Sequence, residues 1–514
     1  MPSNRGLPLL APRKPFGGRR CVWTVIIVLL TFAQWTHAVA ADRPPSALHA
    51  ATTAVLPQWP FYQPQLSVLR RSQRKVFAHY FTQFPISIDN ADPARDYYAV
   101  EYLTPSGEHG KHLAYGGYLR ERPLPRPVRP EPNWKDLDME TEVRRAAAIG
   151  LDGFTVDILS DHGYHWDAVN RLMQAAERVD PGFKIIPMLD MTAEIEDKTG
   201  KPAEGRAADV VRALSRYSSA YRLPDGRLVV SAFRAEIESP DWWRRWLAGL
   251  KAEGIDIAFV PLFLDWKKYA PSFAPISFGL SDWGWRSVKP QAAWRTSAAE
   301  AHKYCPVWMM PVAPQDMRPY GCTYWDAHNS EQFRVMWDNA IRGQADWVQI
   351  ITWNDYSENT EIAPSSGTQN GFYDLAAYYI AWFKTGRPPK ITHDTLYYFC
   401  RNQSASASPD PNKQPTPFAP AAGTDPPSND IELIAFLTRP GTLEIAIGRD
   451  VRRLNAPAGL TSFRVPLVSG RPVFRLVRGT SQVLRLDCDF DIDDHIIYQD
   501  LLYRSGSTLA HIPY

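Results

Sequence analysis

The sequence predicts an α/β protein built on a (β/α)8 TIM barrel, followed by a smaller C-terminal antiparallel β-sandwich domain. Three observations lead to this prediction. The 514 residues exceed the usual size of one domain, and a (β/α)8 barrel takes about 250 of them. Residues 75–388 alternate short apolar runs with amphipathic stretches, as in a parallel sheet that is buried on both faces. Residues 389–514 alternate apolar and polar positions between turn residues, which is typical of a sandwich.

The first 40 residues are predicted to be a signal peptide. A basic stretch ending at Arg20 precedes an apolar run over residues 22–32, and Ala38, Val39 and Ala40 supply small residues for cleavage. The run is too short to span a bilayer comfortably. We therefore expect cleavage after Ala40, a secreted or periplasmic protein and no stable membrane association, with an uncleaved anchor as the alternative. Residues 41–74 are rich in proline and are expected to be extended, either disordered or wrapped on the barrel.

Eight apolar runs are the predicted barrel strands. Helical spacing of apolar residues fills intervals between them, for example over residues 166–179 and 333–341. Eight strands with helices between them imply closure into a barrel. The predicted strands are residues 76–81, 153–159, 184–190, 228–233, 257–264, 276–280, 307–312 and 347–353.

The C-terminal part contains four predicted sandwich strands, at residues 443–447, 463–467, 473–477 and 483–486. Residues 404–429 are rich in Pro, Ser and Ala without periodicity, so a disordered insertion is predicted there. Removal of the signal segment leaves four cysteines, an even number that is compatible with disulfides in an exported protein. Pairing of Cys305 with Cys322 and of Cys400 with Cys488 joins the nearest partners, although spacing alone does not select it.

Composition limits the class of partner. With 57 Lys and Arg against 55 Asp and Glu, the net charge of +2 gives no electrostatic reason to expect nucleic acid or an anionic surface. Aromatic residues make up 12% of the chain, and their faces can stack on sugar rings, although most are expected to pack in the core. No Cys or His pattern has the spacing of a structural zinc site, so we expect neither a metal nor another cofactor.

Polar and aromatic side chains follow several predicted strands. Since (β/α)8 enzymes place working residues at the C-terminal ends of their strands, these positions are candidate substrate contacts. Each has an alternative: the histidine can hydrogen-bond inside the barrel, either acid near an arginine can form an ion pair, and either tryptophan can pack in the core. The candidates are His79, Asp157, Asp190, Glu236, Trp283 and Trp285.

The peptide after the last predicted strand carries two acids three positions apart, Asp355 and Glu358. Glycoside cleavage needs such a pair, one acid to protonate the departing oxygen and one carboxylate to activate water or attack the sugar. Two nearby carboxylates repel, which raises one pKa and makes that group a proton donor. The alternative is an exposed acidic loop that caps the next helix.

The same peptide carries a resemblance to a known family. Residues 353–358, Trp-Asn-Asp-Tyr-Ser-Glu, followed by Ile-Ala-Pro at 362–364, resemble the Trp-Asn-Asp-Tyr-Gly-Glu signature of glycoside hydrolase family 71, the α-1,3-glucanases or mutanases. The similarity runs from about residue 75 to the C-terminus and indicates a divergent, bacterial-type member. Further similar stretches are residues 76–81, 150–154, 183–191, 230–233, 309–312, 382–389 and 394–398.

This resemblance implies an endo-acting, inverting hydrolase of α-1,3-glucosidic bonds in an α-glucan polysaccharide or oligosaccharide. It implies Asp355 and Glu358 as the two catalytic carboxylates, and we assign Glu358 as general acid and Asp355 as general base, with the reverse assignment as the alternative. Trp353, Asn354 and Tyr356 lie beside the acids and are predicted substrate contacts, with packing in the core as the alternative for the two rings. Inversion needs room for a water, with the carboxyl groups about 6.5 to 9.5 Å apart, whereas a retaining pair lies about 5 to 5.5 Å apart.

Some positions depart from the family pattern. Ser357 replaces a Gly, Asp157 stands in place of an Asn, and residues 313–316 lack the usual Ser-Pro-Trp-Phe. These departures leave the glycan and its linkage open. The alternatives are a related barrel glycosidase acting on another glycan and an inactive glycan-binding protein.

Overall fold

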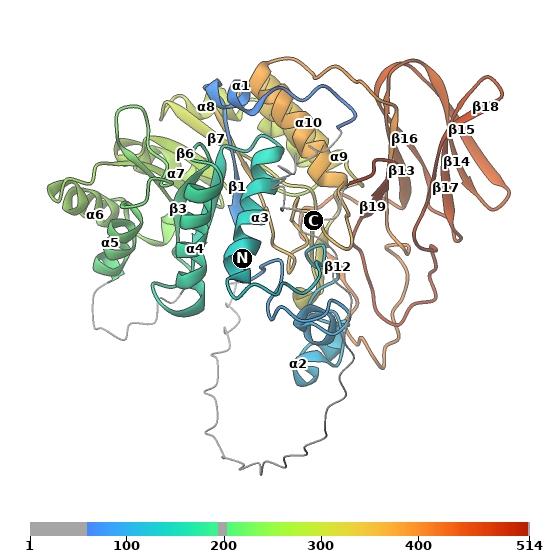
Figure 1. Ribbon diagram of the computed structural model, residues 1–514, viewed down its shortest axis with the longest axis horizontal. Helices are drawn as coiled ribbons and strands as arrows, with labels where there is room; N and C mark the ends of the chain where they lie inside the picture. Colours follow the sequence, from blue (N-terminus) through green and yellow to red (C-terminus); the bar gives the residue numbers. More distant parts are fainter. Residues whose placement is uncertain (1–58, 194–202, 512–514) are drawn as a thin grey trace, which may run out of the picture. The chain divides into compact units, whose positions relative to one another are not determined.

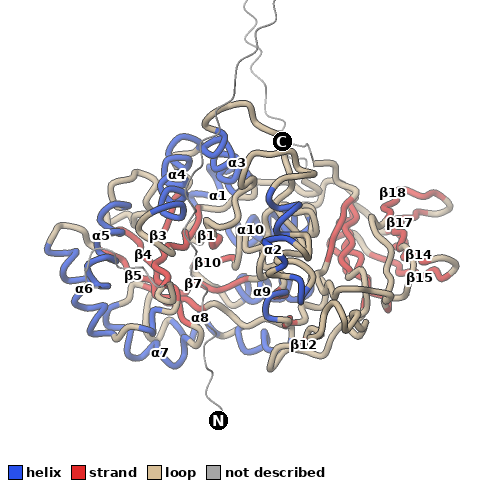
Figure 2. Tube along the Cα trace, turned by 90° about the horizontal axis from the view of Figure 1, so that it is seen from below, coloured by secondary structure: helices blue, strands red, loops and turns tan. Residues whose placement is uncertain are grey.

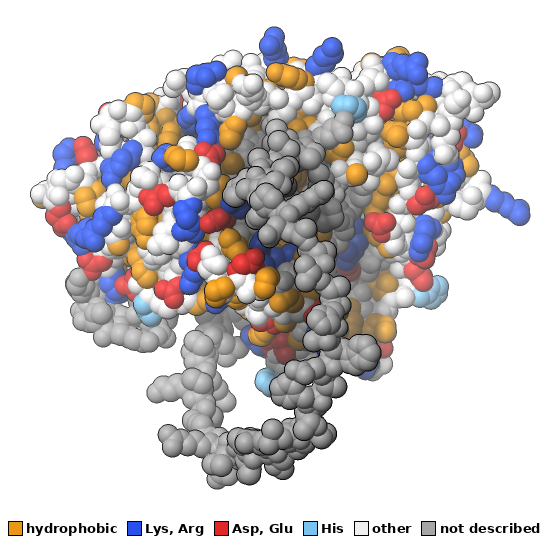
Figure 3. All heavy atoms as spheres, in the orientation of Figure 1, with side chains coloured by type: hydrophobic (Ala, Val, Ile, Leu, Met, Phe, Trp, Pro, Cys, Tyr) orange, Lys and Arg blue, Asp and Glu red, His pale blue; other side chains and the backbone are white. Residues whose placement is uncertain are grey.

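The computed structural model describes residues 59–193 and 203–511. The predicted signal peptide, its cleavage site after Ala40 and the first part of the proline-rich segment lie outside the described residues. Among the described residues, no helix combines the length and the apolar character that crossing a bilayer requires. On the face drawn in Figure 3, acidic and basic side chains are interspersed rather than gathered by sign.

Eight parallel strands close into a barrel in the order β1-β10-β7-β6-β5-β4-β3-β2, which confirms the predicted fold (Figure 1). Their side chains are buried along nearly their whole length because helices cover the outside and side chains fill the inside. The barrel strands are β1 (Lys75–Tyr80), β2 (Gly153–Ile158), β3 (Lys184–Asp190), β4 (Leu228–Phe233), β5 (Ile257–Phe263), β6 (Gly279–Asp282), β7 (Val307–Val312) and β10 (Trp347–Ile350).

The sixth barrel strand begins later than the sequence predicts. Residues Ala274–Ile276 form a short 3-10 turn that contains Pro275, so the strand starts only at Gly279. A proline has no backbone N–H to donate to a neighbouring strand, and its fixed φ suits the start of a turn. Phe278 still donates its backbone N–H to the carbonyl of Phe259 on β5 at 2.8 Å, so sheet pairing begins just before Gly279, and only Ile276 belongs to the turn.

Helices alternate with the barrel strands and surround them in Figure 2. Helix α4 illustrates the pattern, since Val169, Leu172, Met173 and Ala176 recur at helical spacing and are all buried. The segments between the helices and the strands contain short turns. The helices are α1 (Leu66–Arg71), α2 (Gly107–Gly110), α3 (Trp134–Ala148), α4 (Gly163–Val179), α5 (Ala203–Leu214), α6 (Pro240–Ala252), α7 (Trp266–Phe273), α8 (Ser297–Ala301), α9 (Glu331–Arg342) and α10 (Gly371–Thr385).

Helix α10 is buried on nearly all sides because it packs between the barrel and a C-terminal sheet. The Phe372 ring contacts Phe333 of α9 at a centroid distance of 5.5 Å and Phe399 of the sheet at 5.0 Å. The Tyr378 ring lies 5.3 Å from Phe436, also on the sheet. An almost wholly apolar helix sequence is what such a two-sided environment requires.

Two four-stranded antiparallel sheets follow the barrel, with the orders β16-β13-β11-β19 and β15-β14-β17-β18. Their apolar faces share one core, in which Tyr398 of one sheet stacks on Phe474 of the other at 5.3 Å, so the predicted sandwich is present. The strands are β11 (Thr395–Cys400), β13 (Asp430–Leu437), β14 (Gly441–Ile447), β15 (Asp450–Ala456), β16 (Gly459–Pro466), β17 (Pro472–Arg478), β18 (Ser481–Asp487) and β19 (Arg504–Ser507).

A small third sheet joins the loop after β7 to the stretch predicted to be a disordered insertion. It consists of β8 (Asp316–Arg318), β9 (Thr323–Trp325) and β12 (Ala419–Pro420). Farther along, Asp425 accepts hydrogen bonds from the backbone N–H groups of Val288 and Lys289, both at 2.9 Å. Residues 404–429 therefore make ordered contacts with loops of the barrel, because their polar groups find partners there.

The four described cysteines are free thiols. The thiol of Cys400, at the end of β11, and the thiol of Cys488, directly after β18, form a hydrogen bond to each other. Cys305 precedes β7 and donates to the carbonyl of Ser277 at 3.7 Å, whereas Cys322 follows β8. The structure thus brings together one of the two pairs that were considered from the sequence.

Candidate active site

The peptide after β10 forms a pinned loop at the C-terminal end of the barrel. The N–H of Ile351 donates to the carbonyl of Val312 at 2.8 Å, and that of Trp353 donates to His79 at 2.7 Å, so the chain continues along its two neighbouring strands. The loop closes where the N–H of Thr352 donates to Thr360 at 2.7 Å and that of Ile362 donates to Thr352 at 3.0 Å. The two predicted catalytic acids lie between these closing bonds.

Asn354 fixes the loop rather than facing a ligand. Its side-chain N–H group donates to the carbonyls of Phe81 and Phe84 at 2.8 and 3.2 Å, and its oxygen accepts from the N–H of Phe81 at 2.8 Å. The residue is fully buried. The predicted substrate contact is therefore an amide clamp between this loop and the loop after β1, which uses both halves of the amide.

Trp353 and Tyr356 lie inside the fold, which corrects the expectation that they contact the substrate. The Trp353 indole N–H donates to Glu142 at 2.9 Å, and its ring lies 5.3 Å from that of Phe154. Tyr356 packs edge-on against Phe84 at 6.1 Å. Their exposed fractions are 0% and 1%. Large rings in a tight loop turn toward the core, and the polar residues between them turn the other way.

Asp355 is held through one of its two carboxyl oxygens. Its Oδ1 accepts hydrogen bonds from the N–H and hydroxyl of Ser357 at 3.0 and 2.7 Å and from the N–H of Glu358 at 3.2 Å. Within the described part of the chain, Oδ2 accepts none. Burial raises the pKa of Asp355, while the Ser357 bonds and the charge of Arg318 act in the opposite direction. The residue keeps an exposed fraction of 4%.

Glu358 is more accessible, with 16% of its side chain exposed. Its Oε1 accepts from the Tyr320 hydroxyl at 3.2 Å, and its Oε2 lies 2.9 Å from the Arg318 guanidinium. Burial nevertheless raises the pKa of Glu358 to about 8, with the Arg318 charge acting in the opposite direction and the neighbouring Asp355 contributing to the increase. At neutral pH, Glu358 therefore holds a proton.

Arg318 does not overcome this effect because its charge is already shared. It binds Asp316 through two hydrogen bonds of 2.8 Å each, and Arg286 lies 3.3 Å from the same carboxylate. The charges of Arg286 and Arg318 both act on Glu358, yet burial leaves its pKa raised. This arrangement, which we call the arginine cluster, comprises Arg286, Asp316 and Arg318.

The sequence analysis missed the arginine cluster and Tyr320. Asp316, Arg318 and Tyr320 lie in the segment between β7 and α9, where the chain forms β8 and β9 before it enters the helix. Arg286 lies outside this segment. The backbone N–H of Met317 donates to the carbonyl of Glu358 at 2.8 Å, which fixes this segment against the loop after β10. An Asp-Met-Arg-Pro-Tyr run directly after a barrel strand was the available signal.

Asp157 and His79 lie beneath the pair, inside the barrel, and are each 1% exposed. The His79 Nδ1 is 3.2 Å from the hydroxyl of Thr155, and its Nε2 is 3.7 Å from Asp157. Burial lowers the pKa of His79 to about 3, so the ring is neutral. The pKa of Asp157 is raised well above its usual value by burial, then by Asp190 and Asp355. The structure therefore groups three of the predicted acids at one end of the barrel.

Asp190 and Glu236 differ in their partners. Asp190 accepts hydrogen bonds from the N–H and hydroxyl of Thr192, both at 2.7 Å, and burial raises its pKa. Glu236 lies 3.8 Å from the Arg234 guanidinium, which is the ion pair that the sequence analysis left open for it. The Arg234 charge also lowers the pKa of Asp190, so Arg234 is a neighbour of both acids, and Asp190 in turn raises the pKa of Asp157.

Trp283 and Trp285 point in different directions. The Trp283 ring contacts those of His79 and Phe233 at 5.2 and 4.9 Å, toward the barrel axis. Trp285 is 42% exposed and lines a groove beside the ends of β5 and β6. Only Trp283 is in contact with another residue of the predicted site.

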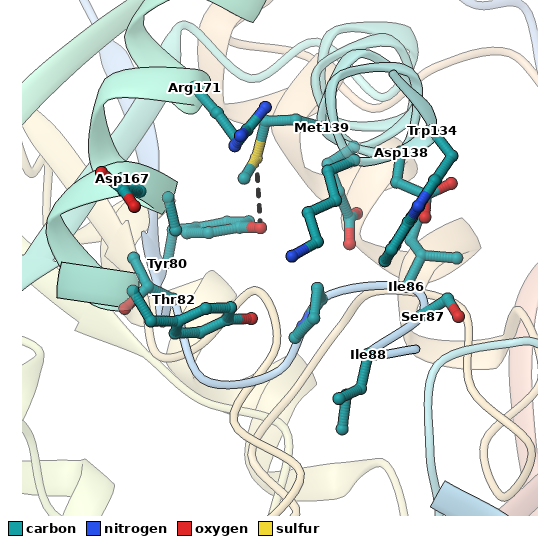
Figure 4. A pocket seen from close by; sticks show the side chains of 15 residues that line it. Tyr80, Thr82, Ile86, Ser87, Ile88, Trp134, Asp138, Met139, Asp167 and Arg171 are labelled. Atoms are coloured by element: carbon teal, nitrogen blue, oxygen red, sulfur yellow. Dashed lines mark hydrogen bonds between the residues drawn. The ribbon is translucent and has the colours of Figure 1, made fainter. Parts of the chain in front are cut away.

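A separate cavity of about 70 Å³ lies between the loop after β1 and helices α3 and α4 (Figure 4). The Tyr80 hydroxyl points across it and donates to the sulfur of Met139 at 3.3 Å. Glu142, the acceptor for the Trp353 indole, also lines it, and burial raises the pKa of Glu142 to about 7. Neither Asp355 nor Glu358 lines this cavity. The described residues also contain no group of three or more His, Cys, Asp or Glu arranged to hold a metal ion.

Comparison with known proteins identifies a family, two relatives and a similar solved structure. The family model described as glycosyl hydrolase family 71 matches residues 128–503. A glucan endo-1,3-alpha-glucosidase of Schizosaccharomyces pombe is 24% identical over 383 residues, which cover 67% of this chain and 84% of that protein. A mutanase of Penicillium rubens is 24% identical over 410 residues, covering 73% and 85%. Among solved structures, a GH99 endo-alpha-mannosidase from Bacteroides thetaiotaomicron has a TM-score of 0.47 and 15% identity, covering 61% of this chain and 98% of that one.

Proposed function

Because the chain belongs to glycosyl hydrolase family 71, and is therefore a glycoside hydrolase, we propose that it cleaves α-1,3-glucosidic bonds inside a glucan chain, with Asp355 and Glu358 as its catalytic pair. The observation that carries this proposal is the placement of Asp355 and Glu358 on the pinned loop at the C-terminal end of the barrel, where Glu358 contacts Arg318 and Tyr320 while Asp355 is held by Ser357 through one oxygen. Burial keeps a proton on Glu358, whose pKa is about 8, while hydrogen bonds and a cation favour the ionised form of Asp355.

The substrate is inferred from relatives. The two curated relatives are named a glucan endo-1,3-alpha-glucosidase and a mutanase, and each is matched over more than four fifths of its own length. The near-neutral net charge of +2 suits an uncharged polysaccharide. We therefore assign α-1,3-glucan as the substrate class.

The proposed reaction is a single displacement. Glu358 gives its proton to the glycosidic oxygen as the bond from that oxygen to the anomeric carbon breaks. Asp355 takes a proton from a water molecule as that water attacks the anomeric carbon from the opposite face. The sugar product has the inverted configuration, and both acids regain their starting protonation by exchange with solvent.

The surroundings of Glu358 suit this change of charge. When Glu358 loses its proton, the Tyr320 hydroxyl and the Arg318 guanidinium already contact its two oxygens, so no rearrangement is needed to stabilise the anion. Beneath the pair, burial and the charges of Asp190 and Asp355 raise the pKa of Asp157 well above its usual value, which favours the neutral form of that acid.

Hydrolysis of a panel of polysaccharides tests this function. Wild-type protein is incubated with α-1,3-glucan, α-1,4-glucan, α-1,6-glucan and a mannan, and the release of reducing ends is measured. We expect release from α-1,3-glucan alone and its loss in Asp355→Asn. Release from a different polymer would reassign the substrate, and equal release by the Asp355→Asn protein would leave a catalytic role for this pair without support.

We also propose that the protein is exported and that residues 1–40 are removed. Support comes from the basic stretch, the apolar run and the small residues that precede Ala41 in the sequence. N-terminal sequencing of protein recovered from outside the cytoplasm should begin at Ala41. A mature protein that still begins with the apolar run would instead indicate an anchor.

A further inference from the structure

A groove of about 460 Å³ lies at the C-terminal ends of β5 and β6, apart from the two acids. Its volume falls within the range of ligand sites, about 300 to 1,000 Å³. We call it the outer groove. Its lining includes Leu264, Asp265, Asp282, Trp285, Pro290 and Trp294.

The turn that presents Trp285 to the outer groove is held in a fixed shape. The two oxygens of Asp282 accept hydrogen bonds from the N–H groups of Gly284 and Trp266 at 2.7 and 2.9 Å. Gly284 has a φ of +81°, and a Cβ at this position would lie 2.8 Å from a side-chain carbon of Pro311. A side chain cannot be accommodated there, so the turn sends Trp283 toward the barrel axis and Trp285 toward the groove.

The lining has the chemistry of a carbohydrate site. Trp285 and Leu264 leave 42% and 50% of their surfaces exposed, so both present apolar surface to the groove. The exposed Asp265 supplies an acceptor at the groove, and the exposed Lys267, whose ammonium lies 2.6 Å from Glu300, adds a cation at the same edge. A flat aromatic face beside groups of both signs suits a neutral, polyhydroxylated ring better than an ion.

The outer groove is connected to the catalytic acid through the chain itself. Arg286 directly follows Trp285 and lies 3.3 Å from Asp316, which in turn binds the arginine in contact with Glu358. On the other side, the Trp285 ring lies close to Gly423, where an added Cβ would be 2.9 Å from the ring. The groove is therefore bounded by the loop after β6 and by the stretch that also pairs with β9.

We propose that the outer groove is a second glucan-binding site, in which Trp285 stacks on a sugar ring of the same polymer at a distance from the bond that is cleaved. This inference rests on the proposed function, because it takes the glucan as the ligand. A site of this kind keeps a long chain attached through a rigid aromatic residue, which adds affinity for polymer without taking part in bond cleavage.

Binding is measured without turnover in the Asp355→Asn protein, by its retardation in native gels that contain carboxymethyl α-1,3-glucan. We expect Trp285→Ala in this background to weaken retardation about tenfold, since a stacked ring is lost, and Trp285→Phe to restore most of it. The matched control is Tyr304→Ala, because Tyr304 is 41% exposed, close to Trp285 in exposure, but precedes β7 at the opposite end of the barrel.

The outcomes separate this inference from the proposed function. Trp285→Ala could be retarded as strongly as its Asp355→Asn parent while wild-type protein hydrolyses α-1,3-glucan. This result would overturn the binding role of the outer groove and leave the proposed function intact. Equal weakening by Tyr304→Ala would overturn it as well, since loss of any exposed ring would then suffice. If wild-type protein neither hydrolyses nor binds α-1,3-glucan, the proposed function fails, and the glucan assignment of the groove fails with it.

Discussion

Two pairs of acids lie close together in the fold, and their exposure and charged neighbours differ. Asp355 and Glu358 form the candidate catalytic pair, and Glu121 and Glu361 form a second pair just behind it. Burial raises the pKa of all four acids. A raised pKa alone therefore marks burial and does not distinguish a working acid from a structural one.

The difference lies in accessibility and in charged partners. Glu121 and Glu361 are 0% exposed, hydrogen-bond to each other and accept from neutral groups such as the N–H of Thr368 at 3.1 Å. Glu358 is 16% exposed and contacts a guanidinium that can stabilise its anion. The comparison indicates that the second pair holds the loop by sharing a proton, while the first pair can exchange its proton with a ligand.

Removing the acids of the first pair should have the largest effect. We expect Asp355→Asn and Glu358→Gln each to lower kcat on α-1,3-glucan by about 10³-fold or more, because each removes a proton-transfer group. Glu361→Gln, the matched change in the second pair, should keep kcat within about threefold, since its amide can still donate to Glu121 as the protonated acid does. Steady-state kinetics of the three proteins check this, and a large loss in Glu361→Gln alone would reverse the comparison.

The cation beside Glu358 should have the next largest effect. In Arg318→Gln the anion formed during catalysis loses its counter-charge, so kcat should fall by about 10²-fold. The pKa of Glu358 should rise further above about 8, because the charge that lowers it is gone. The alkaline limb of kcat/KM should therefore move to higher pH. A limb that moves to lower pH would show that another group sets it.

The shared proton of the second pair should appear as a pH dependence of stability. In the folded protein, the pKa of Glu361 lies well above the ordinary value of 4.5. The protonated side chain therefore contributes fully to the free energy of unfolding below pH 4.5, and this contribution is lost as pH rises. In wild type, this effect should lower the free energy of unfolding by about 1.4 kcal/mol for each pH unit above pH 5. Glu361→Gln has no such group to titrate, so its free energy of unfolding should fall less steeply by that amount. Urea denaturation from pH 5 to 8 measures both slopes, and parallel slopes would mean that Glu361 is ionised in the folded protein.

The Tyr320 hydroxyl that donates to Glu358 should contribute least to catalysis. Tyr320→Phe removes one hydrogen bond to the Glu358 anion, which is worth about 1 kcal/mol, so kcat should fall about fivefold. Tyr304→Phe, which lies far from the pair, should leave kcat unchanged. A loss as large as that of Glu358→Gln would indicate that the tyrosine itself transfers the proton.

The sequence predicted the barrel well because buried parallel strands carry a continuous apolar signal. The strand over residues 307–312 was predicted with its observed bounds. The sixth strand was predicted to begin at residue 276 because Ile276 is apolar, whereas Ile276 lies in the turn that follows Pro275 and the backbone of Phe278 is already paired with β5. Apolar character alone does not separate sheet pairing from packing.

The candidate site was predicted only in part, since loops have no periodicity from which the direction of a side chain follows. Asp355 and Glu358 were found from their spacing and from the family signature, whereas the inward turn of Trp353 depends on Glu142, which lies far away in the sequence. Arg318 and Tyr320 were missed because their segment is fixed by pairing with residues 419–420, a contact that local sequence does not reveal.

The most direct test of the Asp355 and Glu358 mechanism is proton NMR of the first sugar released from α-1,3-glucan, recorded before mutarotation. A water activated by Asp355 on the face opposite to the bond protonated by Glu358 must give the β-anomer first. We expect the β-anomeric signal to appear at once and the α signal to grow in later. An α-anomer that appears first would contradict the single displacement and the roles assigned to both acids.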